Sequence, residues 1–153
     1  VHNRTMGTGR WRQKLKKFRA LNGADKWMLL HATVWLALAR IMLLVMPFPR
    51  LAKRLSAKKG ASESRPDPEL VERIGHAVQT AAGNVPWRSD CFPQGIAAWM
   101  ILKHHGYTGT IHLGVERSGE EDLIGHAWLT YGDTVITGGE DLDRYAEIHR
   151  LGA

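Results

Sequence analysis

Hydrophobic residues recur at every third or fourth position through the earlier part of the chain, and later they alternate with polar residues. The first spacing is typical of a helix buried on one side, and the second is typical of a half-buried strand. We therefore predict helices at residues 10–21, 27–48, 68–82 and 91–105, a strand at 110–116, and a β-hairpin at 122–139 that turns at Gly132-Asp133. Helices followed by antiparallel strands indicate an α+β fold.

The long apolar helix at 27–48 raises the question of a membrane span. Its 22 residues would measure about 33 Å at about 1.5 Å per residue, which is enough to cross a bilayer core. Arg40 would cost about 3 kcal/mol at the centre of that core. Lys26, Thr33 and Arg40 are spaced by seven and share one face. This polar face favours a helix packed on protein or lying at an interface, and Asp25 is expected to cap its start.

The charges are distributed unevenly. Residues 1–60 hold 14 Lys and Arg against one acid, whereas the remainder holds 21 − 14 = 7 basic and 15 − 1 = 14 acidic residues. This asymmetry suggests that the N-terminal part meets an anionic partner or surface. We predict three parts: basic and apolar helices for partner or membrane docking at 1–59, a linker at 60–66 and a folded domain at 67–153.

Cys91 is the only cysteine, so no disulfide can form within the chain, and a cytoplasmic setting fits this composition. Ser89 or Asp90 is expected to cap the helix at 91–105, and Pro93 is tolerated because it falls in the first turn. Unpaired N–H groups and the helix dipole at this end stabilise a thiolate and favour nucleophilic attack. The alternative is that Cys91 is simply a small buried apolar residue.

A histidine on the predicted hairpin is a candidate base for this thiol. His126, Trp128 and Thr130 are expected to share one face of the first hairpin strand. A helix-start cysteine with a strand-borne histidine is typical of enzymes that transfer acyl groups through a thioester. His104, His105 and His112 are weaker candidates. The histidines lack paired metal-ligand spacing, so neither a metal nor a cofactor is expected.

Four sequence segments together resemble a known family. "VPWRSDC" at the start of a helix, "IHLGV", "GHAW" and "VITGG" are similar to the lasso-peptide biosynthesis B proteins, which are leader peptidases of the transglutaminase-like, papain-type cysteine superfamily. The basic helix, the apolar helix and "PFPRLAKRL" also resemble the front of the split-form B proteins. The resemblance implies a transglutaminase-like core with a helix-borne cysteine and a strand-borne histidine, preceded by N-terminal helices.

Carried over to this chain, the family's site implies Cys91 as nucleophile and His126 as general base. In the family, a carboxylate that orients the imidazole lies on the strand after the histidine strand. The corresponding stretch here contains Gly138 and Gly139, and a two-residue turn would pair His126 with Gly139. Asp141 is a diagonal neighbour of His126 in that register and is our candidate, although it could equally cap a helix. A Cys-His dyad assisted by Thr137 is the alternative.

The implied reaction is hydrolysis of one peptide bond, which releases the leader from a ribosomally made precursor. The resemblance also implies a separate leader-recognition protein and an ATP-dependent lasso cyclase, because nothing before Asp67 indicates the strand-rich recognition domain of the fused family members. Two other classes stay open. One is an amide-forming acyltransferase or transglutaminase, and the other is a basic module that binds nucleic acid or membrane without catalysis. Nucleic acid is not expected as a partner, since no known binding signature occurs.

Overall fold

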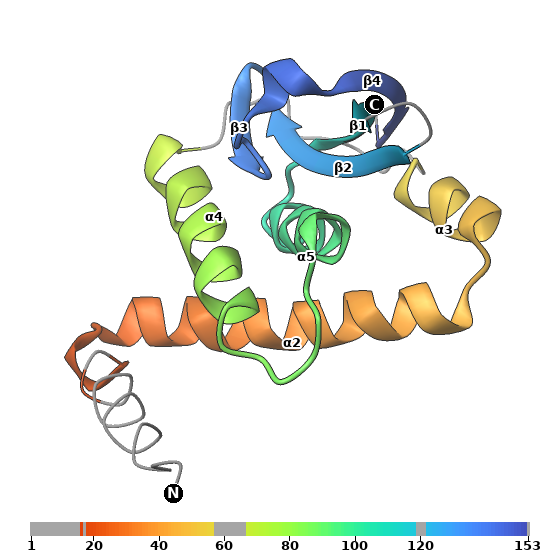
Figure 1. The fold of residues 1–153 in the computed structure, drawn as a ribbon. Helices are drawn as coiled ribbons and strands as arrows, with labels where there is room; N and C mark the ends of the chain where they lie inside the picture. Colours follow the sequence, from red (N-terminus) through yellow and green to blue (C-terminus); the bar gives the residue numbers. More distant parts are fainter. Residues whose placement is uncertain (1–15, 17, 57–66, 119–121, 153) are drawn as a thin grey trace, which may run out of the picture.

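The computed structural model describes residues 16, 18–56, 67–118 and 122–152. Within them the helices come first: α2 (Gly23–Val45), α3 (Phe48–Leu55), α4 (Pro68–Ala82) and α5 (Cys91–His104). Figure 1 shows α2 along one side of the molecule and α5 between α2 and the sheet, with α4 and α3 on either side of α5. Most of the predicted basic helix at 10–21 lies outside the described residues. The helix predicted at 68–82 has those bounds in the structure, whereas the helices predicted at 27–48 and 91–105 are present with shifted ends.

A four-stranded antiparallel sheet follows the helices, in the order β3-β2-β1-β4. Its strands are β1 (Thr110–Ser118), β2 (Asp122–Tyr131), β3 (Thr134–Thr137) and β4 (Ala146–Leu151), and a short 3₁₀ helix, η1 (Leu142–Arg144), joins β3 to β4. The predicted strand and hairpin correspond to β1, β2 and β3, whereas β4 was not predicted. The α+β class is confirmed.

The start of α2 differs from the prediction. Asn22, not Asp25, is the N-cap, and its side-chain oxygen accepts a hydrogen bond from the backbone N–H of Asp25 at 2.8 Å. The helix therefore begins at Gly23, because Asn is as good a cap as Asp and lies three residues before the N–H it satisfies. The Asp25 carboxylate instead forms an ion pair with Arg73 of α4 at 3.5 Å. It thereby helps to fix α4 against the start of α2.

One hydrophobic core joins the helices to the sheet. Buried residues of α2 recur at helical spacing and belong to the same cluster as Leu51 of α3, Ile96 of α5 and Leu129 of β2; on α2 they are Met28, Ala32, Leu36 and Ala39. α2 is also long and apolar enough to cross a bilayer, by length and composition. Of its apolar stretch, 22% is buried inside the protein. The four buried residues of α2 therefore pack on the protein, whereas most of the helix keeps part of its surface exposed.

The hairpin register matches the prediction only near its turn. Thr130 pairs with Val135 and Tyr131 with Thr134, as a two-residue turn requires. A bulge then shifts the register, so that Leu129 pairs with Thr137, the last residue of β3. The predicted pairing of His126 with Gly139 is therefore wrong. Gly138 follows with a φ of +71°, a left-handed conformation that turns the chain away from the strand direction.

Candidate active site

Cys91 is the first residue of α5, and Asp90 is the N-cap, in agreement with the sequence prediction. The Asp90 side chain makes no capping hydrogen bond and instead lies 3.4 Å from Arg88 in an ion pair. The first turn of α5 also contains no acidic residue. The backbone N–H groups of this turn therefore receive no capping hydrogen bond from the Asp90 carboxylate. Cys91 is half-buried and lies at the positive end of the helix dipole.

Two polar atoms in the segment before Cys91 are buried without a partner. Trp87 Nε1 and Ser89 Oγ form no hydrogen bond with any described residue. The Ser89 carbonyl accepts a hydrogen bond from Gln94 Nε2 at 2.7 Å, which holds this segment against the first turn of α5. A buried polar group without a partner costs about 1–3 kcal/mol.

A backbone oxygen fixes the ring of His126. Its Nε2 lies 2.8 Å from the carbonyl oxygen of Gly138. A carbonyl can only accept, so Nε2 carries the proton, and in the neutral ring Nδ1 holds the lone pair. The ring also stacks on Tyr145, with 4.5 Å between centroids and an interplanar angle of 25°. His126 is thus held in the tautomer that a general base working through Nδ1 requires.

Alternation along β2 places the His126 side chain on the face of the sheet opposite to the one that packs against α5, the helix that begins at Cys91. His126 shares its strand face with Trp128, whereas Leu129 belongs to the opposite face and packs in the core with residues of α5. In the described part of the chain, Cys91 Sγ forms no hydrogen bond, and none joins it to His126. The pairing of these two residues stays a prediction.

The two candidates for a third member have different surroundings. Asp141 has a left-handed backbone (φ 52°), is exposed, occupies the N-cap position of η1 and lies 3.7 Å from Arg144 in an ion pair. Its carboxylate forms no hydrogen bond with His126 among the described residues. Thr137 is only 1% exposed, and its Oγ1 lacks a hydrogen-bond partner among those residues. The acceptor at His126 Nε2 is the Gly138 carbonyl, and a role for Asp141 or Thr137 stays a prediction.

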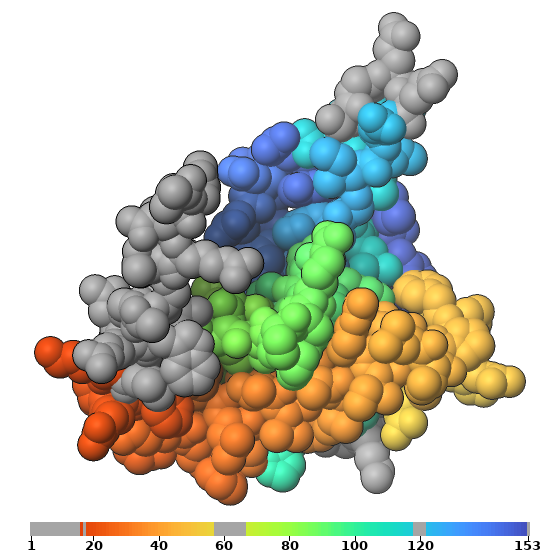
Figure 2. Space-filling view, turned by 60° about the horizontal axis from the view of Figure 1, so that its bottom comes forward, coloured from red at the N-terminus to blue at the C-terminus, as the bar shows by residue number. Residues whose placement is uncertain are grey.

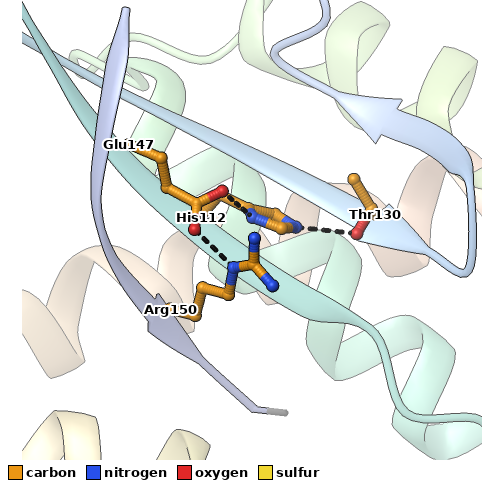
Figure 3. Close-up of polar contacts among 4 residues, drawn as sticks. All are labelled: His112, Thr130, Glu147 and Arg150. Carbon is orange, nitrogen blue, oxygen red and sulfur yellow. Dashed lines mark hydrogen bonds and ion pairs between the residues drawn. The ribbon is translucent and has the colours of Figure 1, made fainter.

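Sequence reasoning missed a hydrogen-bonded group centred on His112 (Figure 3). Its Nδ1 donates to Glu147 Oε2 at 2.8 Å, and its Nε2 lies 2.8 Å from Thr130 Oγ1. Glu147 also accepts from Arg150, and that hydrogen bond, followed by the one from His112, lowers the pKa of the Glu147 carboxyl. The group connects β4, β1 and β2. Only the pairing of β4 with β1 brings Glu147 to His112, and β4 had no recognisable pattern in the sequence.

Four rings stack across the same face of the sheet. Trp128 lies between His112 and His126, with centroid distances of 5.2 Å and 6.1 Å, and Tyr145 covers the other side of His126. Gly114 makes room for this arrangement, because a Cβ there would lie 2.8 Å from Cζ3 of Trp128. Trp128 therefore stacks on both imidazole rings and fixes their positions relative to each other.

Other features of the described residues do not suggest a different centre. No group of three or more His, Cys, Asp or Glu side chains in that part of the chain could hold a metal ion. A groove of about 950 Å³ between α2 and α4 is lined by residues such as Met28, Arg73 and Thr80, and its lining includes none of the three predicted site residues. Cys91 and the polar face of the sheet therefore stay the candidates for the chemistry of the site among the described residues.

One protein-family model matches most of the chain. The model of the transglutaminase-like superfamily core matches residues 34–150, from the middle of α2 to the end of the sheet. Searches of the curated proteins and of the solved structures found no match. The family match covers more than half of the chain, both helix-borne Cys91 and strand-borne His126 included. The chain belongs to the transglutaminase-like superfamily.

Proposed function

We propose that this protein is a cysteine peptidase that removes the leader from a ribosomally made lasso-peptide precursor. The observation that carries the proposal is that the only cysteine of a transglutaminase-like chain is the first residue of α5. The helix dipole and the N–H groups of that turn favour a thiolate there. The substrate class comes from the sequence resemblance to the lasso B proteins.

In the proposed reaction, the Cys91 thiolate attacks the scissile carbonyl and a C–S bond forms. N–H groups at the start of α5 are suited to stabilise the oxyanion. The C–N bond then breaks as protonated His126 gives its proton to the leaving amine. Water attacks the thioester while His126 takes a proton from it, the C–S bond breaks, and the new carboxylate leaves.

Nδ1 of His126 is the atom that moves the proton in this scheme, because Nε2 is hydrogen-bonded to the Gly138 carbonyl. The transfer requires Cys91 Sγ and His126 Nδ1 to lie within hydrogen-bonding distance in the substrate complex. Such contacts are often long before substrate binds. Neither a metal nor an organic cofactor takes part in the proposed steps.

The proposal includes partners. A separate leader-recognition protein would deliver the precursor, and an ATP-dependent lasso cyclase would close the ring after cleavage, both in the cytoplasm. The carboxylate that orients the imidazole in the family would be replaced here by the Gly138 carbonyl, with Asp141 or Thr137 as possible contributors. A backbone acceptor selects the same tautomer as a carboxylate but stabilises the imidazolium less, because it carries no charge.

Mass spectrometry of the precursor peptide, incubated with this protein and the recognition protein, tests the proposal. We expect loss of a leader-sized fragment with the wild type and none with Cys91→Ala or His126→Ala. His149→Gln, which changes an exposed histidine on β4, should cleave like the wild type. Equal behaviour of wild type and Cys91→Ala would exclude Cys91 as the nucleophile, and absence of cleavage in both would favour a binding role for the basic helices.

The family match also favours a second candidate, an amide-forming acyltransferase. The same acyl-enzyme would then pass its acyl group to an amine instead of water. Repeating the incubation with a primary amine distinguishes the two reactions. A peptidase gives a free carboxylate with or without the amine, whereas an acyltransferase needs the amine and adds its mass to the product.

A further inference from the structure

A continuous apolar stripe runs along the solvent side of α2. We call it the outer stripe and define it by six residues that are 40–72% exposed: Trp27, Leu30, Val34, Leu38, Ile41 and Val45. They recur every three or four residues, on the side of the helix opposite Ala32 and Leu36, which are fully buried. Figure 2 shows the exposed side of α2 across this face of the molecule, with α3 at one end. No described segment of the chain covers the outer stripe.

Positive charge accompanies the outer stripe. The described residues between 16 and 56 include seven cations: Lys16, Arg19, Lys26, Arg40, Arg50, Lys53 and Arg54. At about 100° per residue, Lys26 and Arg40 lie on the same side of the stripe, Lys26 about 40° and Arg40 about 80° beyond its edge. None of the seven forms an ion pair with a described residue, and the one acid in that region, Asp25, is paired with Arg73. Among the described residues between 16 and 56, the charges that are left unpaired are therefore all positive.

From this geometry we propose that the outer stripe docks on the surface of a membrane that contains anionic lipids. α2 would lie in the plane of the interface, with its apolar residues among the acyl chains and the cations against the headgroups. Its 23 residues give about 34 Å of contact at about 1.5 Å per residue. Trp27, 61% exposed, stands at one end of the stripe, and aromatic rings of this kind are favoured at the membrane interface.

The packing of α2 argues against a span. Its inner face is buried against α4 and α5 in the common core, so a helix surrounded by lipid would have to lose that packing. The charge argues against a second copy on the stripe, because pairing two α2 helices along this face would bring cations next to cations. An interfacial helix keeps its inner face on the protein and brings cations beside the stripe close to anionic headgroups.

Co-sedimentation of the full chain with vesicles tests this inference without any peptidase assay. We expect binding to vesicles of phosphatidylcholine mixed with phosphatidylglycerol, and at least about tenfold weaker binding to phosphatidylcholine alone. The double variant Leu30→Glu/Leu38→Glu should lose at least about tenfold in binding, because two apolar side chains would be replaced by charges that headgroups repel. Arg50→Gln/Lys53→Gln should reduce binding to the anionic vesicles only.

The matched control is Leu123→Glu/Ile148→Glu, which changes two side chains on the sheet that are 65% and 63% exposed. It should bind vesicles like the wild type, and far-ultraviolet circular dichroism should show that both double variants are folded. Binding that survives Leu30→Glu/Leu38→Glu would overturn the inference, as would a wild type that stays in the supernatant with both vesicles. If light scattering shows that the wild type is a dimer and that Leu30→Glu/Leu38→Glu is a monomer, the outer stripe binds a second copy of the chain. That result would also overturn the inference.

Discussion

At Gly138 a left-handed backbone coincides with a close approach that leaves no room for a Cβ. Its φ of +71° is left-handed, and a Cβ there would collide with the carbonyl oxygen of Ala127. The same residue presents its own carbonyl to His126 Nε2. The absence of a side chain at Gly138 is therefore what allows its backbone to approach β2 and hold the imidazole.

We predict that Gly138→Ala destabilises the protein more than Gly132→Ala and also impairs cleavage. Gly132 has a φ of +55° but open space around a Cβ, so Gly132→Ala should cost only the backbone term of about 1 kcal/mol. Gly138→Ala adds the collision with Ala127 and displaces the acceptor of His126. Urea unfolding of both variants gives the free energies of unfolding, and equal losses would show that the close approach at Gly138 has no energetic weight.

The edge strand β4 is fixed to the sheet by side chains as well as by its ladder. Glu147 of β4 accepts from His112 of β1, and His112 in turn contacts Thr130 of β2. Because the pKa of Glu147 is lowered, chiefly by Arg150 and then by His112, the folded state binds its proton less readily than the unfolded state does. This contribution to stability is present above the ordinary pKa of 4.5 and is lost as the pH falls through the lowered value.

Glu147→Gln should therefore lower the melting temperature at neutral pH, and the difference from the wild type should shrink as the pH falls below about 4.5. The glutamine keeps the size of the side chain but removes its charge and replaces one of the two acceptor oxygens by an N–H donor group. Thermal unfolding followed by circular dichroism over a pH series measures both curves. A difference that does not change with pH would mean that the charge of Glu147 contributes nothing to the attachment of β4.

The helices and the hairpin could be predicted from the sequence because their signals are local. Asp90 as N-cap and Pro93 in the first turn of α5 placed Cys91 correctly, and alternation assigned His126 to a strand. The register of β3 could not be predicted, because the bulge beside Thr130 depends on how β3 packs against β2 and not on its own residues. The search for a carboxylate opposite His126 then led to Asp141, whereas the observed acceptor is a main-chain oxygen without a residue signature.

A single core organises the described part of the molecule, from Met28 of α2 to Leu151 of β4. Leu36 and Leu51, which belong to the N-terminal helices, are fully buried in it together with Ile74 and Leu129. A shared core couples the helices to the sheet across the division that the sequence suggests at 60–66, and that division stays a prediction.

We accordingly expect one cooperative unfolding transition for the whole chain. Tryptophans of α2, α5 and β2 report on tertiary packing, and far-ultraviolet circular dichroism is dominated by the helices, so the two probes should give the same midpoint in urea. Cys91→Ala should preserve this coincidence. Two separate transitions would mean that the N-terminal helices form a unit of their own, as the domain division at 60–66 predicts.

The half-exposed position of the chain's only thiol has a practical consequence for chemical biology. A thiol-reactive electrophile on a synthetic peptide can attach only at Cys91. The position of the adduct is therefore known, and no other cysteine has to be replaced first. Peptides that differ only in the residues next to the reactive carbon would label Cys91 at different rates. Those rates rank the peptide sequences that bind best beside the start of α5. The natural precursor need not be known for that ranking.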